Sequence, residues 1–182
     1  LPVLAELPIG RTSEQIARYA YRSFDRQWTF SDPRLAKTES PSLWSSSSPQ
    51  QLFLTSKMSL PLGKGPAAVV TSDVPDLHYF CGRGGKDIIP LYRDAAGTPN
   101  VAADTLSTIT TTHQANDDSV SAITPESLFC YAYGILAGAD YTDRFAEALE
   151  TPGPRVPLTA DPNLFAEVAA HGEYLLWLHT YG

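Results

Sequence analysis

Arginine and lysine side chains in the first half of the sequence have the types and the spacing of a surface that binds a polyanion. Both residues neutralise phosphates, and Arg can also form paired hydrogen bonds with the edge of a guanine base. They are interleaved with aromatic side chains or stand in loops rich in glycine, serine and proline. The predicted set of phosphate- and base-contacting residues is Arg22, Arg26, Arg34, Lys37, Lys57, Lys64, Arg83 and Lys86.

Three glycines surround Arg83 in the string Gly82-Arg83-Gly84-Gly85. One interpretation is structural, because a hairpin or bulge at this point needs positive backbone angles, which glycine adopts freely. The other interpretation is functional, since a loop with a bare backbone lets Arg83 and Lys86 approach phosphates or base edges. Both assign Gly82, Gly84 and Gly85 to a turn, and the two are compatible.

The same loop contains one literal match to an enzyme signature, because residues 80–84 read F-C-G-R-G. This string resembles the F-x-G-x-G cofactor motif of S-adenosylmethionine-dependent methyltransferases, which requires a strand before it and a helix after it. Residues 85–92 include two β-branched isoleucines and Pro90, so this stretch is a poor start for a helix. Moreover, no Asn-Pro-Pro-Tyr or Asp-Pro-Pro-Tyr string follows. A fragment that retains S-adenosylmethionine binding therefore stays only as an alternative.

The remaining side chains predict no catalytic or metal-binding group. His78 and Cys81 have the spacing of half a zinc site, but a tetrahedral site needs four ligands. Cys130 falls in a predicted helix, and the other three histidines form no second pair. Nucleophile-elbow, phosphate-loop and nuclease groupings do not occur in the sequence. We therefore expect no catalytic residue, no metal and no cofactor in this segment.

Charge is divided unevenly along the 182 residues. Residues 1–93 carry 11 Lys and Arg against 8 Asp and Glu, a net charge of +3, whereas residues 94–182 carry 2 against 12, a net charge of −10. The total of −7 predicts weak binding of nucleic acid by the isolated segment. A polyanion site is expected in the first half, and the second half is expected to be scaffold or to face other protein parts.

Alternating aromatic and polar residues predict two short strands and a tight connection between Ile16 and Phe30. Further strands are expected at Leu52 to Ser56, Ala67 to Ser72, Leu77 to Phe80 and Asp87 to Tyr92, with a turn at 60–66. Residues 38–50 are rich in serine and proline and predict an exposed loop. The basic half is therefore also the β-rich half.

The aromatic residues of the first hairpin are expected to form its core face. They are Tyr19, Tyr21, Phe24, Trp28 and Phe30. Alternation along a strand would place Arg18 and Arg22 together on one face. Arginines that point outward together are the expected result.

The second half has helical periodicity. Thr124 before Pro125 predicts the start of one helix, and Asp161 before Pro162 predicts the start of another. Residues 94–123 show no clear period, and their structure is left open between a variable loop and a weak helix around Ala102 to Ile109. The predicted fold class is α+β, with a β-rich amino-terminal half of hairpins in a mixed or antiparallel sheet, packed on a helical carboxy-terminal half.

We expect one domain over residues 1–182, with a β-rich basic part at 1–93, a variable part at 94–123 and a helical scaffold at 124–182. Two cysteines are too few for a disulfide framework and indicate a reducing, cytoplasmic location. No apolar run is long enough for a membrane span, so no membrane partner is expected. Leu1 comes first without a signal-peptide pattern, which favours a fragment of a longer polypeptide.

Three groups of residues occur in a fixed order along the chain. They are Tyr21 to Trp28, Y-R-S-F-D-R-Q-W, with Asp32-Pro33-Arg34-Leu35; residues 75–85, P-D-L-H-Y-F-C-G-R-G-G, with Pro90-Leu91-Tyr92; and Tyr131 to Leu136, Y-A-Y-G-I-L, leading through Tyr141 and Phe145 to Pro154-Arg155-Val156-Pro157. Together they resemble the carboxy-terminal part of type ISP restriction-modification enzymes, from about Arg11 to His179. Ser23, where relatives commonly have proline, and the polar 94–123 stretch depart from the family pattern.

This resemblance implies a polypeptide with a nuclease domain, an ATP-driven DNA translocase, an N6-adenine methyltransferase and, last, a target recognition domain. The present chain would be that last domain, with double-stranded DNA and the methyltransferase domain of the same polypeptide as partners. S-adenosylmethionine, ATP and Mg²⁺ would belong to the other domains. A rival hypothesis is a protein interaction module that docks onto the methyltransferase without DNA contact, in which case counterion release would not govern binding.

Overall fold

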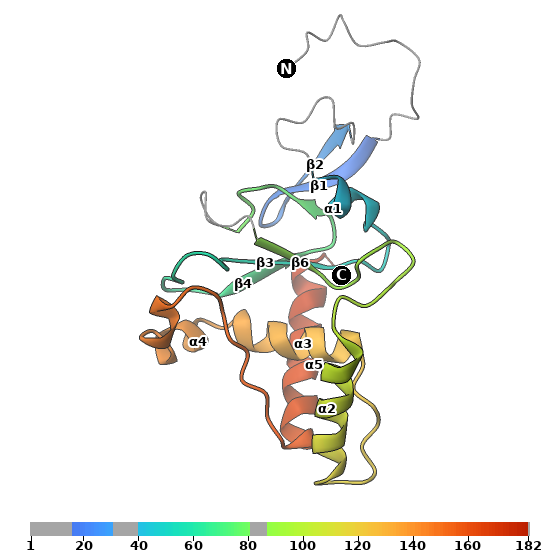
Figure 1. Cartoon of the computed structure of the whole chain (residues 1–182). Helices are drawn as coiled ribbons and strands as arrows, with labels where there is room; N and C mark the ends of the chain where they lie inside the picture. The colour runs from blue at the N-terminus through green and yellow to red at the C-terminus, as the bar shows by residue number, and fades with distance from the viewer. Residues whose placement is uncertain (1–15, 31–39, 81–86, 182) are drawn as a thin grey trace, which may run out of the picture.

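The computed structural model describes residues 16–30, 40–80 and 87–181, which form two small sheets above a layer of helices (Figure 1). The strands are β1 (Ile16–Arg22), β2 (Asp25–Phe30), β3 (Phe53–Ser56), β4 (Ala68–Thr71), β5 (Val74–Pro75) and β6 (Asp87–Pro90). The helices are α1 (Pro41–Ser45), α2 (Ala103–Gln114), α3 (Pro125–Leu136), α4 (Ala139–Arg144) and α5 (Pro162–His179), with a 3-10 turn, η3, at Ala148–Glu150. The predicted α+β class, with strands first and helices mainly in the second half, is confirmed.

The first sheet is mixed and has the order β2-β1-β5, whereas the second is antiparallel and has the order β4-β3-β6. The hairpin at 16–30 and the strands expected near residues 52–56, 67–72 and 87–92 are confirmed, with small differences at their ends. The strand predicted at Leu77 to Phe80 is wrong. The Asp76 side chain accepts a hydrogen bond from the His78 amide at 2.8 Å, which closes a turn instead.

The serine-rich segment predicted as an exposed loop is only partly one within residues 40–50. Pro41 starts the short helix α1, because proline is pre-set for the first helical position. Ser46 and the neighbouring Gln51 are almost completely buried. The Gln51 amide donates to the carbonyls of Ser46 (2.7 Å) and Tyr92 (2.9 Å), and its Oε1 accepts from the Tyr92 amide at 3.1 Å. This side chain ties the segment to the residues that follow β6.

Helices α3 and α5 begin at their predicted caps. Thr124 accepts a hydrogen bond from the Ser127 amide in a reciprocal capping box, and Asp161 accepts from two amides at the start of α5. The weak helix considered around Ala102 to Ile109 is present as α2, which continues to Gln114. None of the helices in the described ranges has the length and apolar character needed to cross a bilayer.

Helices α3 and α5 cross in the centre of the helical layer (Figure 1). Two glycines, Gly134 and Gly172, lie at the crossing. A Cβ atom added to Gly172 would lie 1.8 Å from the Cys130 carbonyl oxygen, and one added to Gly134 would lie 2.7 Å from that of Val168. Only a residue without a side chain allows such a close approach of two backbones. Tyr133 and Leu176, which flank the crossing, belong to the apolar core that includes residues of β3 and β4.

Tyr133 and His179 form a polar pair beside this crossing that predicts a pH-dependent stability. The Tyr133 hydroxyl lies 2.5 Å from His179 Nδ1 and donates to it when the imidazole is neutral. Burial lowers the pKa of His179 from its ordinary value of 6.5. The unfolded state therefore binds more protons below that value, so the stability from this site is complete above pH 6.5 and is lost as the pH falls toward the folded pKa.

We expect the free energy of unfolding to decrease from about pH 7 to about pH 5, in part through His179. Urea unfolding at a series of pH values measures this slope. His179→Gln keeps an acceptor but does not titrate, so it should flatten the slope in this window. A variant with the wild-type slope would contradict the assignment.

Candidate nucleic-acid interface

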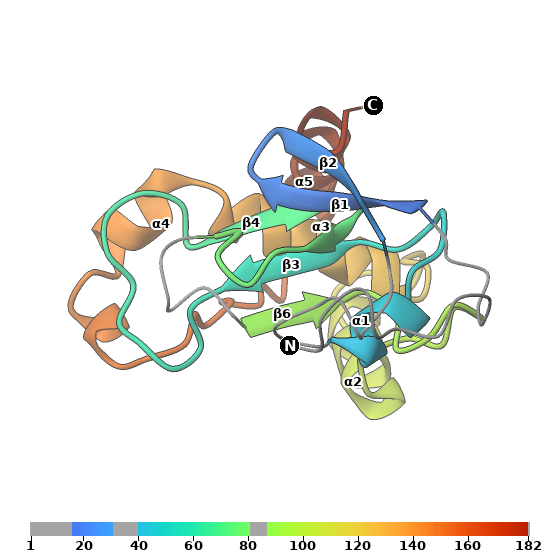
Figure 2. The ribbon, with the colours of Figure 1, turned by 90° about the horizontal axis from the view of Figure 1, so that it is seen from above.

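Connections that leave the two sheets at one side of the molecule form a common edge. We call it the loop edge and define it by residues 22–25, 57–67 and 76–80. Strands β1 and β5 are parallel neighbours, so Arg22 and Asp76 follow the same end of the first sheet. In the second sheet Ser56 pairs with Asp87, which brings the start of β6 to the β3–β4 connection. Figure 2 shows the hairpin turn and that connection on the same side.

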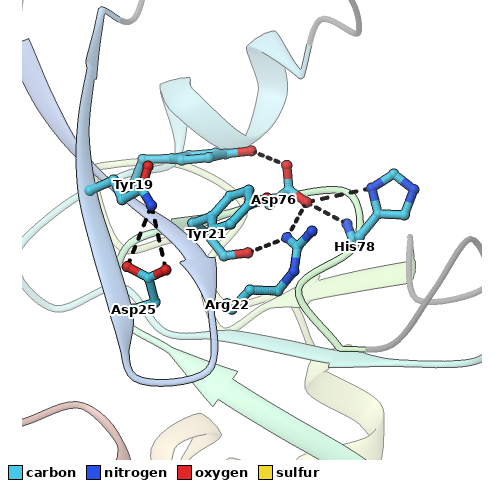
Figure 3. A network of polar contacts seen from close by, with 7 residues as sticks. Tyr19, Tyr21, Arg22, Asp25, Asp76 and His78 are labelled. Atoms are coloured by element: carbon cyan, nitrogen blue, oxygen red, sulfur yellow. Dashed lines mark hydrogen bonds and ion pairs between the residues drawn. The ribbon is translucent and has the colours of Figure 1, made fainter.

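One carboxylate joins the hairpin to the turn after β5 (Figure 3). Asp76 Oδ2 accepts a hydrogen bond from the Tyr19 hydroxyl at 2.5 Å. Its Oδ1 accepts from Arg22 Nη1 and from the His78 amide, both at 2.8 Å, and His78 Nδ1 lies 3.5 Å away. Burial alone would raise the pKa of Asp76, but these hydrogen bonds outweigh it and hold the pKa below its ordinary value. Asp76 is therefore an ionised hub at neutral pH.

A β-bulge explains why Tyr19 and Arg22 reach the same carboxylate. The pairing of β1 with β2 shifts register between Ala20 and Arg22, so that Arg22 lies opposite Asp25. The shift places the Arg22 side chain on the same side of the hairpin as the Tyr19 side chain. The prediction that Arg18 and Arg22 share a face is therefore wrong, because strict alternation does not continue through a bulge.

The other face of the hairpin carries an exposed row of apolar side chains and one exposed arginine. Ile16, Trp28 and Phe30 are more than half exposed. Arg18 pairs with Trp28 across the strands, and its guanidinium lies 4.4 Å from the indole centre. Arg18 is a candidate contact that the predicted set omits, although the hairpin register would have indicated its cross-strand partner.

The prediction that the hairpin aromatics form a core face is wrong for four of the five residues. Exposed are Tyr21, Phe24, Trp28 and Phe30. Tyr19 is half-buried and stacks against Trp44 of α1, with 6.4 Å between the ring centres. The hairpin lies at the periphery of the molecule (Figure 1), where the described chain covers one of its faces more than the other.

Arg26 is turned toward the fold. Its Nε lies 2.8 Å from Asp73 Oδ2, in a close ion pair that is too poorly aligned for a hydrogen bond. Its Nη2 donates to Ser72 Oγ at 2.8 Å and to the Thr180 carbonyl at 2.9 Å. The guanidinium also lies 4.0 Å from the centre of the Tyr181 ring. These contacts tie the hairpin to the end of α5, so the geometry assigns Arg26 a structural role and does not support the predicted contact with DNA.

Three other members of the predicted DNA-contacting set lie in the described part of the chain, and four lie outside it. Arg22 has a side chain that is 41 % exposed, and Lys64 is exposed on the loop edge, where Lys57 is half-buried. Outside the described residues lie Arg34, Lys37, Arg83 and Lys86, together with the turn glycines Gly82, Gly84 and Gly85. Phe80 and Asp87, which flank residues 81–86, lie at or next to the loop edge. The assignments of the undescribed residues stay predictions.

Cys130 is a half-buried free thiol on α3. Burial first, and then the charges of Glu173 and Glu126, raise the pKa of its thiol to about 11. The thiol is therefore protonated at neutral pH, whereas the thiolate is the reactive form of cysteine. Within the described ranges, no group of three or more His, Cys, Asp and Glu side chains is placed to hold a metal ion.

Asp76→Asn is expected to reduce the free energy of unfolding by about 1–3 kcal/mol, because it removes the ionised acceptor shared by Tyr19, Arg22 and the turn. Urea unfolding of the chain measures this loss. Asp25→Asn is a matched control on the hairpin, since Asp25 is exposed and its hydrogen bonds to Gln27 are long, at 3.4 and 3.5 Å. Equal losses in both variants would argue against Asp76 as the hub.

Comparison with known proteins adds a family and a set of similar folds. Residues 4–182 match the family described as Type ISP C-terminal specificity domain. The chain is 24 % identical to DrdV in a DrdV–DNA complex, with a TM-score of 0.71. The match covers 91 % of this chain and 16 % of DrdV. No curated protein matches the chain.

Two further similar structures are type ISP restriction-modification enzymes. LlaBIII bound to DNA is 15 % identical with a TM-score of 0.69, and the match covers 94 % of this chain and 11 % of LlaBIII. A nuclease-deletion mutant of LlaGI in complex with a DNA substrate mimic is 19 % identical with a TM-score of 0.60, and the match covers 93 % and 12 %. The chain thus spans between 11 % and 16 % of the length of these solved proteins.

Proposed function

Because the chain belongs to the family of Type ISP C-terminal specificity domains, we propose that it reads the DNA target sequence for a larger restriction-modification polypeptide. The observation that carries this proposal is the family match over residues 4–182. In the three similar structures the protein is bound to DNA or to a DNA substrate mimic, and double-stranded DNA is the ligand proposed here. The nuclease, translocase and N6-adenine methyltransferase activities, with S-adenosylmethionine, ATP and Mg²⁺, are proposed for the rest of that polypeptide.

The loop edge and the adjoining hairpin supply the proposed DNA contacts. A two-stranded ribbon fits the major groove of B-DNA, where base edges can be distinguished. Arg22 is held in place by Asp76 through Nη1, and a guanidinium has five N–H donors in all, so a fixed orientation is compatible with further hydrogen bonds. Lys64 is placed to contact phosphate, which positions a protein on DNA without reading its sequence.

The helical half is proposed to hold these loops in register against the methyltransferase domain of the same polypeptide. Its net charge of −10 over residues 94–182 does not suit a phosphate backbone. A protein surface is the better partner for it. The cytoplasm is the proposed location, as for other proteins that act on bacterial DNA.

Exchange of this chain for the corresponding segment of a full-length type ISP enzyme tests the proposal. The methylated sequence in cellular DNA should become that of the donor of the segment. Reinsertion of the recipient's own segment by the same junctions is the control, and it must restore the original methylation. Active chimeras that keep the recipient's sequence would show that recognition lies elsewhere.

Arg83→Ala is predicted from the sequence to weaken specific DNA binding by the full-length polypeptide by about 1–3 kcal/mol if Arg83 meets a base edge. If it meets only phosphate, the loss should be nearly uniform across DNA sequences. Titrations with the cognate duplex and with single-base variants, at fixed salt, distinguish the two. Arg144→Ala, on α4 in the acidic half, is the control and should change neither. Unchanged binding by Arg83→Ala would remove Arg83 from the site.

A further inference from the structure

Near its carboxy-terminal end, helix α5 carries apolar side chains on its outward side as well as on its inward side. Its buried residues include Gly172 and Leu176. On the opposite side Tyr174, Trp177 and Leu178 follow each other at helical spacing and are between 41 % and 60 % exposed. A helix segment with apolar side chains on opposite sides is normally buried on both of them. The outward side of α5 is therefore a surface that lacks its partner in the described chain.

The hairpin turn meets the chain at and just beyond the carboxy-terminal end of α5. Phe24 is exposed, and its ring meets Tyr181 at 6.1 Å and His179 at 5.7 Å in edge-on contacts. Tyr174 and Trp177 stack at 6.0 Å. We define the aromatic face as Phe24, Tyr174, Trp177, Leu178 and Tyr181. It combines residues from two segments that are far apart in the sequence.

Backbone geometry indicates that this arrangement is maintained at a cost in free energy. Phe24 and Tyr181 both have positive φ angles, 62° and 71°, and they are the two non-glycine residues of the described chain that do. Aromatic residues rarely adopt this conformation, and such strain concentrates at functional surfaces. The two strained residues are in contact with one another and with solvent.

The charges of α5 select a protein as the partner of this face. The helix contains Glu167 and Glu173 and no Lys or Arg, so a phosphate backbone would be repelled. A large exposed apolar patch typically marks a site of protein association. The chain spans only 11 % to 16 % of the similar solved proteins, and its family is described as a C-terminal domain. Most of the surface available to it would therefore belong to the preceding part of the same polypeptide.

We propose that the aromatic face packs against a preceding part of the same polypeptide, on an apolar surface bordered by Lys or Arg side chains that complement Glu167 and Glu173. This proposal rests on the proposed function, since it needs the chain to be one domain of a larger enzyme. Phe24 lies in the hairpin turn, so docking through this face would also fix the orientation of the loop edge relative to the rest of the polypeptide.

Hydroxyl-radical labelling of the full-length polypeptide without DNA, followed by mass spectrometry, tests the proposal. Trp28 and Trp177 are a matched pair within this chain, because they are 63 % and 56 % exposed. Trp177 should be oxidised several-fold more slowly than Trp28 in the full-length protein. Equal rates would overturn the proposal. Protection of Trp177 that appears only after addition of a DNA duplex, or that disappears on dilution, would assign the face to DNA or to a second copy and would also overturn it.

A double substitution, Tyr174→Ser with Trp177→Gln, identifies the partner surface. It should increase labelling of a peptide outside this chain that is apolar and flanked by Lys or Arg. Leu158→Gln is the control, since Leu158 is also about half exposed but lies outside α5, and it should change no labelling outside the chain. The same result from both variants would overturn the proposal. Neither measurement involves sequence reading, so failure of the segment exchange and failure of this test are distinguishable.

Discussion

Gly172→Ala is expected to reduce the free energy of unfolding by at least about 3 kcal/mol, at or beyond the upper end of ordinary overpacking. The added Cβ atom would lie 1.8 Å from the Cys130 carbonyl oxygen. That oxygen belongs to the backbone of α3, so no side-chain rotation can relieve the clash. The two helices must separate, and the core around Tyr133 and Leu176 must lose contacts. Urea unfolding followed by circular dichroism measures the loss.

Two other glycine substitutions control for the change of residue type. Gly138→Ala would put Cβ at an ordinary 3.7 Å from the Ile135 carbonyl oxygen, and Gly63 has open space around it. Both should change stability by no more than about 1 kcal/mol. The loss of stability in Gly134→Ala should be larger than in these two variants and smaller than in Gly172→Ala, because its added Cβ atom would lie 2.7 Å from the Val168 carbonyl oxygen. If Gly172→Ala were as stable as Gly138→Ala, the backbones of α3 and α5 would not be in close contact at Gly172.

Local signals were enough to predict the starts of α3 and α5 and the position of the first hairpin. A cap such as Thr124 or Asp161 acts within three residues of its own position, so its effect is present in the sequence. The crossing of α3 and α5 was not predictable in this way. Gly172 in the middle of a helix looks merely unfavourable until its neighbour across the crossing is known. The turn at 76–79 was missed for a similar reason, since aromatic alternation there competes with the side chain of Asp76.

The candidate site was predictable in composition and less so in geometry. Exposure of Arg22 and Lys64 agrees with an outward, basic loop edge. Arg26 has the same residue type and a neighbouring position, but its direction depends on Asp73 and on the end of α5, far away in the sequence. The bulge that turns Arg22 away from the face of Arg18 has no clear signature in the residues, so the relative direction of these two arginines was not predictable. Acidic residues that are distant in the sequence, and irregularities such as the β-bulge, therefore decide which arginines remain available to a ligand.

Arg26→Ala is expected to reduce the free energy of unfolding by about 2–3 kcal/mol, somewhat below the loss for a fully buried ion pair. The expected loss is smaller than for a fully buried pair because the side chains of Arg26 and Asp73 are 25 % and 18 % exposed, so solvent screens their attraction. The substitution leaves the Asp73 carboxylate without its ion-pair partner and the Thr180 carbonyl without this donor, and it removes the guanidinium from the Tyr181 ring. Urea unfolding of the two proteins at neutral pH gives the difference.

A double-mutant cycle with Asp73→Asn separates the ion pair from the other contacts of Arg26. Residues in direct contact typically show a coupling of about 0.5–3 kcal/mol, and we expect a value in that range here. Arg26→Lys keeps the charge but loses the planar fork that reaches Ser72 and Thr180, so it should recover only part of the stability. DNA binding gives the opposing test. If Arg26→Ala left stability unchanged but reduced the salt dependence of binding by about one phosphate contact, Arg26 would belong to the DNA surface and not to the fold.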